Sequence, residues 1–213
     1  QVKKTPKGYF VHTCELLDGT IHVDDEVTAS VDEKRRAAIC RNHTATHLLQ
    51  KALREVLGEH VHQAGSYQDD QITHFDFTHF SAVSPAELAE VERRVNEKIY
   101  EALPVTVKNL PIEEAKKMGA MALFGEKYGS VVRVVDAGGW STEFCGGTHV
   151  TNTAQIGCFK ILSESSVAAG IRRIEATTAF GVLDLLDDRT EILAKTAVAL
   201  KANNMKDVAA RAQ

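Results

Sequence analysis

NHTATHLLQKALREVLG, residues 42–58, decides the first large element of this fold. Its apolar residues recur at the three- and four-residue spacing of one stripe of an α-helix, and Gly58 is placed to end that helix. Asn42 is a suitable N-cap, so the sequence predicts a helix from about residue 42 to residue 57. The stripe consists of Ala45, Leu48, Leu49, Ala52, Leu53, Val56 and Leu57.

A second helix is predicted from SPAEL, residues 84–88. Ser84 as N-cap, Pro85 at the first helical position and Glu87 at the third form a capping box. Pro104 ends the helical pattern. The stripe that faces the core is Leu88, Val91, Val95, Ile99 and Leu103.

The rest of the chain shows the period-two alternation of strands. The first thirty residues alternate around an Asp18-Gly19 turn, which predicts a β-hairpin and a further strand. Later strands are expected in HFDFTHF (74–80), VTVKN (105–109), VVRVV (131–135), CFKIL (158–162) and IRRIEAT (171–177), with a short helix at about 111–118. We therefore expect an α+β architecture.

Three domains are expected along the chain. They are a partial small β-barrel in residues 1–35, a two-layer sheet-and-helix domain in 36–178, and a helix in 179–213. In the last segment Leu186, Leu193 and Leu200 recur every seven residues. This spacing fits either a surface helix that docks on the domain or a coiled coil.

Composition narrows the class of protein. The 213 residues are 44% apolar and 25% charged, which is ordinary for a globular protein. The net charge of −4 offers no broad basic surface, so any nucleic-acid contact must be local. No apolar run is long enough to cross a membrane, so we expect no membrane partner and a cytoplasmic protein with reduced thiols. The chain begins at Gln1 without a methionine, which suggests an excised piece of something longer.

Two pairs of metal-ligand residues stand far apart in the sequence. His43 and His47 are one helical turn apart, on the face opposite the apolar stripe, and Cys145 and His149 flank two glycines in CGGTH. Three imidazoles and a thiolate are ligands that Zn²⁺ accepts in a tetrahedron. The alternatives are a solvated polar helix face for the first pair and a glycine-rich turn with a buried thiol for the second.

Two physical details accompany this zinc hypothesis. The two glycines are expected to let the backbone turn sharply so that Cys145 and His149 converge. With Asn42 as N-cap, His43 lies in the first helical turn, where the helix dipole disfavours a protonated imidazole. Because protons compete for the ligand nitrogens, zinc affinity is expected to fall as the pH drops through the histidine range.

Several longer words of this sequence resemble the editing domain of alanyl-tRNA synthetase. They are NHTATHLL (42–49), GAMALFGEKYG (119–129), STEFCGGTH (141–149), IGCFKI (156–161) and GIRRIEAT (170–177). The resemblance runs from about Gly8 to Thr178 and extends to the freestanding AlaX deacylases and, more distantly, to threonyl-tRNA synthetase. It favours an excised fragment of a bacterial-type synthetase.

The resemblance implies a function and a set of site residues. The function is proofreading, in which the ester between serine or glycine and the terminal ribose of alanine tRNA is hydrolysed. His43, His47, Cys145 and His149 match the zinc positions, with Thr46 reading the substrate side chain and Gln63 close to the ester. The residues that could meet phosphates of the acceptor end are Arg172, Arg173 and Lys127.

Two questions stay open at this point. Four protein ligands usually mark a structural zinc, whereas a catalytic zinc keeps a position for water, so either role is compatible with this sequence. The competing function is a zinc-stapled module that binds the acceptor end without chemistry of its own. A hydrolase of small free esters is less favoured. No Ser-His-Asp pattern is evident, so water is the expected attacking group.

Overall fold

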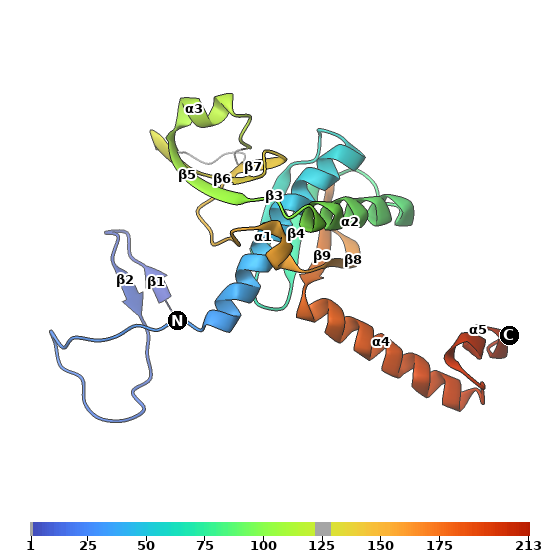
Figure 1. Cartoon of the computed structure of the whole chain (residues 1–213). Helices are drawn as coiled ribbons and strands as arrows, with labels where there is room; N and C mark the ends of the chain where they lie inside the picture. The colour runs from blue at the N-terminus through green and yellow to red at the C-terminus, as the bar shows by residue number, and fades with distance from the viewer. Residues whose placement is uncertain (1, 122–128) are drawn as a thin grey trace. The chain divides into compact units, whose positions relative to one another are not determined.

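The structure is a computed structural model that describes residues 2–121 and 129–213 (Figure 1). It divides into two compact units, Gln1–Val31 and Asp32–Gln213. The second unit is an α+β arrangement of two antiparallel sheets and several helices, which confirms the expected fold class. No helix in the described ranges is long and apolar enough to cross a membrane.

The N-terminal unit contains one short hairpin. Strands β1 (Val2–Lys4) and β2 (Phe10–His12) pair antiparallel, and residues 13–31 form neither helix nor strand. The predicted hairpin around Asp18-Gly19 is therefore wrong, although the chain bends there, with the Gly19 backbone N–H donating to the Asp18 carboxylate at 2.8 Å. The apolar side chains of this segment are not buried, since Leu17 is 88% exposed and Val23 is 91% exposed. A strand pattern without a half-buried face does not stabilise a strand.

Helix α1 (Glu33–Leu57) begins well before Asn42. Asp32 is its N-cap and accepts a hydrogen bond from the Arg35 backbone N–H at 2.9 Å, and Gly58 ends it as predicted. The predicted N-cap role of Asn42 is wrong, because its buried amide instead joins the helix to the backbone carbonyl of Asp69 and the hydroxyl of Thr178. The first turns of α1 carry mostly polar and charged side chains, so the spacing of apolar residues did not predict that the helix extends to Glu33.

The larger sheet is antiparallel with the strand order β3-β4-β9-β8. Helices α1 and α2 (Pro85–Tyr100) lie beside it (Figure 1). Apolar residues of these helices and of the sheet belong to one core. Phe75, Phe77 and Ile174 from the sheet are fully buried there with Leu48 and Leu49 from α1. The strands are β3 (Gln63–Gln68), β4 (Thr73–Thr78), β8 (Phe159–Ala168) and β9 (Ile171–Thr178).

The capping box of α2 is confirmed. The Glu87 backbone N–H donates to Ser84 Oγ at 3.3 Å, and the Glu87 carboxylate accepts from the Ser84 backbone N–H at 2.8 Å. Val91, Val95 and Ile99 face the core as predicted. The helix ends at Tyr100, before Leu103.

The smaller sheet carries the CGGTH segment at its end. Its strand order is β5-β6-β7, and helix α3 (Ile112–Lys117) follows β5. Strand β7 runs directly into Cys145, so the edge of this sheet delivers the second pair of metal-ligand residues toward α1. The strands are β5 (Val105–Pro111), β6 (Val131–Ala137) and β7 (Ser141–Phe144).

The C-terminal segment is helical, as predicted, but it is not one continuous helix. Helix α4 (Phe180–Ala199) follows β9. The 3-10 helix η1 (Thr153–Ile156) lies outside this segment, before β8. A further 3-10 turn η2 (Met205–Asp207) leads into α5 (Val208–Arg211). Leu186 and Leu193 of α4 are exposed on this chain.

Candidate metal centre

Four metal-ligand side chains meet between α1 and the end of β7. The donor atoms of His43, His47, Cys145 and His149 all lie within 4.8 Å of one another. Cys145 Sγ is 3.4 Å from His43 Nε2 and 3.3 Å from His149 Nε2. A tetrahedral Zn²⁺ with bonds of about 2.0 Å to nitrogen and about 2.3 Å to sulfur separates two such donors by about 3.5 Å. The arrangement of these residues therefore fits zinc.

The helix pair does not lie on a solvated face. His47 is only 6% exposed and His43 is half-buried, because the segment after β7 covers them. The solvated-face alternative is thus wrong for His47. The first-turn argument for His43 is also wrong, because this residue lies in the interior of α1.

Burial, rather than the helix dipole, keeps the imidazoles neutral. It lowers the pKa of His43 to about 4 and that of His149 to about 3, and the nearby Arg133 guanidinium contributes to both shifts. The pKa of the fully buried His47 is lowered well below its usual value, first by burial and then by His149, His43 and Arg133. Neutral imidazole is the form that ligates a metal, so all three are ready to bind near neutral pH.

Burial has the opposite effect on the acidic groups of the cluster. It raises the pKa of the Cys145 thiol and raises that of the Glu143 carboxyl to about 8. Glu143 Oε2 lies 3.7 Å from His47 Nε2. Because the Glu143 carboxyl and the His47 imidazole are both neutral near pH 7, their contact is not an ion pair. Ser141 Oγ donates to Glu143 Oε1 at 3.2 Å and helps to hold the carboxyl there.

The two glycines of CGGTH have different roles. Neither adopts the left-handed backbone region, so the predicted sharp turn is not the reason for them. A Cβ atom on Gly147 would lie 2.0 Å from His43 Cε1 and 2.4 Å from His43 Nδ1, whereas a Cβ atom on Gly146 would meet nothing within 4 Å. Gly147 is needed because the imidazole of His43 occupies the space that a side chain would take.

Arg133 of β6 holds the backbone of the CGGTH loop. Its Nη1 donates to the carbonyl oxygens of Cys145 at 2.6 Å and Gly147 at 2.8 Å, and its own carbonyl accepts from the Cys145 backbone N–H at 3.0 Å. Sequence reasoning missed this residue. The available signal was a single charged residue within the apolar strand VVRVV, where the neighbours Val132 and Val134 are buried.

The two residues expected near the substrate lie on α1 and β3. Thr46 is buried, with its hydroxyl 2.9 Å from the Asn42 carbonyl and 2.7 Å from Thr73 Oγ1. Gln63 lies at a β-bulge at the start of β3, and its Nε2 donates to Ser66 Oγ at 3.3 Å. Bulges re-aim side chains at functional edges. The roles of Thr46 and Gln63 remain predictions.

The residues expected to meet phosphates are placed as follows. Arg172 pairs with the carboxylate of Glu164 through Nε and Nη2, and Arg173 pairs in the same two-point way with Asp76. Their positive charges are therefore balanced by neighbouring carboxylates. Lys127 lies outside the described residues.

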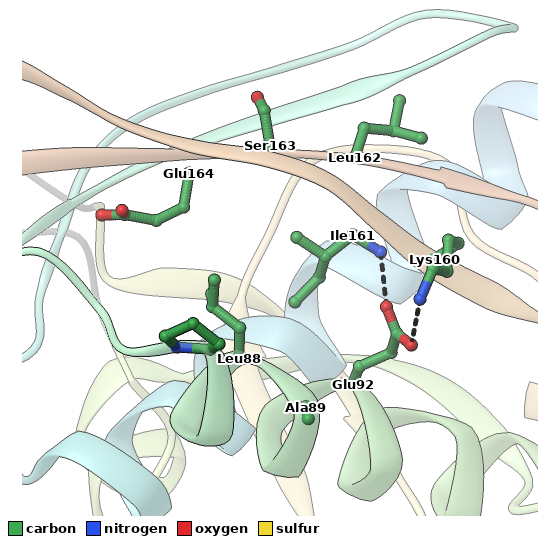
Figure 2. A pocket seen from close by; sticks show the side chains of 9 residues that line it. Leu88, Ala89, Glu92, Lys160, Ile161, Leu162, Ser163 and Glu164 are labelled. Carbon is green, nitrogen blue, oxygen red and sulfur yellow. Dashed lines mark hydrogen bonds and ion pairs between the residues drawn. The ribbon is translucent and has the colours of Figure 1, made fainter. Parts of the chain in front are cut away.

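A separate pocket of about 410 Å³ lies between α2 and β8 and contains none of the four metal-ligand residues (Figure 2). Figure 2 shows Glu92 of α2 bridging to β8, where its carboxylate accepts from Lys160 Nζ at 2.8 Å and from the Ile161 backbone N–H at 2.9 Å. The polar side chains drawn there already have partners, because Glu92 and Lys160 join helix to sheet, and Ser163 and Glu164 bond to Glu175 and Arg172 of β9. We therefore take the His and Cys cluster, not this pocket, as the candidate site.

Comparison with known proteins gives an independent result. Residues 132–175 match the family model of the threonyl and alanyl tRNA synthetase second additional domain, a range that includes Arg133, Cys145 and His149. The alanine--tRNA ligase of Halalkalibacterium halodurans is 50% identical over 212 residues, which is 100% of this chain and 24% of the ligase. That of Acetivibrio thermocellus is 54% identical over 201 residues, which is 94% of this chain and 23% of the ligase.

Each of these matches covers nearly the whole of this chain but only part of the ligase. The alanine--tRNA ligase of Shouchella clausii is 52% identical over 210 residues, again covering 99% of this chain but 24% of the ligase. This chain thus spans about a quarter of the length of the relatives that it matches. Along its whole length it is similar to a segment of the alanine--tRNA ligases, and residues 132–175 within it are similar to the second additional domain of threonyl and alanyl tRNA synthetases.

Proposed function

We propose that this chain hydrolyses the ester of mischarged alanine tRNA and releases serine or glycine from the terminal ribose. The observation that carries the proposal is the four-donor cluster of His43, His47, Cys145 and His149, in a segment similar to alanine--tRNA ligases. The partners would be the acceptor end of alanine tRNA and the rest of a parent ligase. The reaction would take place in the cytoplasm, where tRNA is charged.

A second hydrolytic site answers a known limit of synthetases for small amino acids. A binding pocket cannot strongly reject a near-isostere that adds only a hydroxyl, so errors are removed by hydrolysis afterwards. Recognition of serine requires a polar group that alanine would leave unpaired. Thr46 suits this role: its hydroxyl donates to the Asn42 carbonyl and contacts Thr73 Oγ1 at 2.7 Å, which leaves at least one acceptor lone pair by the inventory of its described contacts.

The chain's own residues would bind, orient and shield the substrate. The three imidazoles and the thiolate would hold Zn²⁺, which when bound supplies a positive charge that orients and polarises the ester. Arg133 holds the backbone of the loop that carries Cys145 and His149, through the carbonyl oxygens of Cys145 and Gly147. Gln63 would orient the ester or the attacking water. An aminoacyl ester is already labile, so positioning and electrostatic help can be enough.

One observation supports a second candidate function. Four protein donors complete a tetrahedron, which is the closed arrangement usual for structural zinc. The chain would then be a zinc-stapled module that binds the acceptor end. The two candidates differ at Gln63, which a pure binder does not need for its metal. Under the hydrolytic proposal, Gln63→Ala keeps its zinc but releases serine more slowly.

The test is release of amino acid from serine-, glycine- and alanine-charged alanine tRNA, with the zinc content measured in the same samples. The wild-type chain should release serine and glycine and spare alanine, and Cys145→Ala should lose both zinc and release. Cys158→Ala is the matched control, because this half-buried thiol is outside the cluster. Full activity of zinc-free, folded Cys145→Ala contradicts the proposal. Absence of release from zinc-loaded wild type that still binds the tRNA favours the binding module.

A further inference from the structure

The hydroxyl of Thr44 links α1 to the loop that carries Cys145 and His149. Thr44 is 1% exposed, and its Oγ1 lies 2.9 Å from the Cys40 carbonyl oxygen one turn earlier on the helix. The same oxygen accepts from the Val150 backbone N–H at 3.2 Å and lies 3.1 Å from His149 Nδ1. Three polar contacts thus converge on one oxygen atom.

The direction of these hydrogen bonds follows from counting donors. A threonine hydroxyl has one proton to donate and two lone pairs that accept. The Cys40 carbonyl can only accept, so it takes the proton, and the Val150 N–H can only donate, so it occupies one lone pair. The remaining lone pair faces His149 Nδ1, which must therefore carry the proton in that contact.

This assignment determines which nitrogen of His149 can bind a metal. A neutral imidazole with its proton on Nδ1 has its free lone pair on Nε2. That Nε2 atom lies 3.3 Å from Cys145 Sγ, inside the four-donor cluster. In the opposite tautomer, the Nε2 proton would point into the cluster and exclude a cation.

We propose that Thr44 is a positioning residue that selects the Nδ1–H tautomer of His149 and so presents Nε2 to the metal. Hydrogen bonds of this kind to the outer nitrogen of a ligand histidine fix its tautomer and ring orientation. The inference rests on the zinc part of the proposed function and not on the hydrolysis. Neither measurement below uses tRNA, so failure of this inference and failure of the proposed hydrolysis are distinguishable.

The first measurement needs no variant. ¹⁵N-labelled histidine in the metal-free chain reports the tautomer of each ring near neutral pH, where burial keeps His149 neutral. The expected spectrum has His149 with a protonated Nδ1 and an unprotonated Nε2. A protonated Nε2 in the folded, metal-free chain overturns the inference.

The second measurement compares zinc affinities by competition with a chelator. Thr44→Val has nearly the shape of threonine but cannot accept from His149, so we expect zinc affinity to fall by about 10-fold to 100-fold, as for other partners of ligand histidines. Thr44→Ser restores the hydroxyl and should return affinity to within a few fold. Loss in the valine variant without rescue by serine overturns the inference.

Thr153→Val is the matched control for general loss of stability. Thr153 is also fully buried, donates to the Lys98 carbonyl at 2.7 Å and accepts from the Leu103 backbone N–H at 2.8 Å, but it does not contact the cluster. It should weaken folding as much as Thr44→Val and leave zinc affinity unchanged. Equal loss of zinc affinity in both variants overturns the inference.

Cobalt substitution supplies a spectroscopic signature. Co²⁺ bound by three imidazoles and one thiolate in a tetrahedron absorbs visible light strongly, and the absorption depends on ligand geometry. The Thr44→Val spectrum should weaken and shift relative to wild type, while the spectra of Thr44→Ser and Thr153→Val should match it. An unchanged Thr44→Val spectrum shows that another contact orients His149 and contradicts the proposal.

Discussion

The two pairs of the cluster are built from very different backbone. His43 and His47 are four residues apart on the long helix α1, whose own hydrogen bonds and buried apolar stripe set their spacing. Cys145 and His149 lie on an irregular segment beyond β7. The loop pair is positioned by contacts with residues distant in the sequence, namely Arg133, Thr44 and the imidazole of His43 beside Gly147.

This contrast indicates where the cluster is vulnerable. A helix transmits a local change poorly to ligand positions, because many other hydrogen bonds maintain its geometry. A loop held by a few contacts depends on each one. We therefore expect substitutions that act on the loop pair to alter metal affinity most, and substitutions that only weaken a helix to alter stability without altering the metal site.

Gly147→Ala is expected to have the largest effect. Its Cβ atom would overlap the His43 ring, and neither the backbone of the loop nor the ring of a ligand can move without disturbing the donors. Zinc affinity should fall by about 100-fold or more, given that even outer contacts of ligands contribute about 10-fold to 100-fold. Gly146→Ala is the control, with open space around its Cβ atom, and should change affinity by less than about twofold. Equal effects of the two substitutions would contradict this account of the loop.

The pH dependence of zinc affinity should also originate in the loop. The pKa of the Cys145 thiol is raised, so the thiol is protonated near neutral pH and must release one proton when zinc binds. One released proton means that affinity rises about tenfold per pH unit below the thiol pKa. The histidine pKa values of about 4 and about 3 mean that imidazole protons compete only in more acidic solution. The sequence-based expectation of a fall through the ordinary histidine range is thus revised.

Competition titrations at several pH values between about 5 and 8 measure this slope, a range that lies above the lowered histidine pKa values and below the thiol's usual one. Cys145→Ser, whose hydroxyl does not ionise in this range, should bind zinc weakly and with a much flatter slope. Cys158→Ala should keep the wild-type slope. A wild-type curve that is flat from pH 8 to pH 7 and then bends near pH 6.5 would show that histidine protonation dominates instead.

Arg133→Gln is expected to lower zinc affinity by about tenfold, toward the smaller end of effects for outer contacts. The substitution removes two hydrogen bonds from a charged donor to the loop, each of the class that contributes about 1.5 to 3 kcal/mol. Arg93→Gln on α2 is the control, since this exposed arginine is also hydrogen-bonded, but to Glu90 and Glu97. Affinity that is equal in the two variants would show that the loop holds its shape without Arg133.

The same contrast explains which parts of the molecule could be predicted from sequence. Elements with a buried apolar face could be predicted, including α2 with its capping box and strands such as β9. Burial of one face requires apolar residues at helical or strand spacing, and this spacing is visible in the sequence. The predicted start of α1 failed because its first turns bury little. The predicted hairpin at Asp18-Gly19 failed because its alternating residues cover no core.

The candidate site divides in the same way. Spacing alone predicted that His43 and His47 share one helix face, and the structure brings them together with Cys145 and His149. The contacts of Arg133 and Thr44 could not be predicted, because they join residues far apart in sequence and depend on how the two sheets are placed. No local pattern encodes a hydrogen bond from a strand arginine to two loop carbonyls.

Ser84→Ala should have the smallest effect on the metal. It removes the N-cap bond from the Glu87 backbone N–H to Ser84 Oγ and the bond from the Ser84 hydroxyl to the Glu87 carboxylate, which together should lower the free energy of unfolding by about 1 kcal/mol. Denaturation in urea measures this loss, and Ser166→Ala, at an exposed position with one long contact, should cost less. Zinc affinity should equal that of wild type, because α2 contributes no ligand and does not contact the CGGTH loop through any described hydrogen bond. A drop in zinc affinity comparable with that of Arg133→Gln would mean that helix stability and loop geometry are coupled, and the distinction between the two pairs would then have to be abandoned.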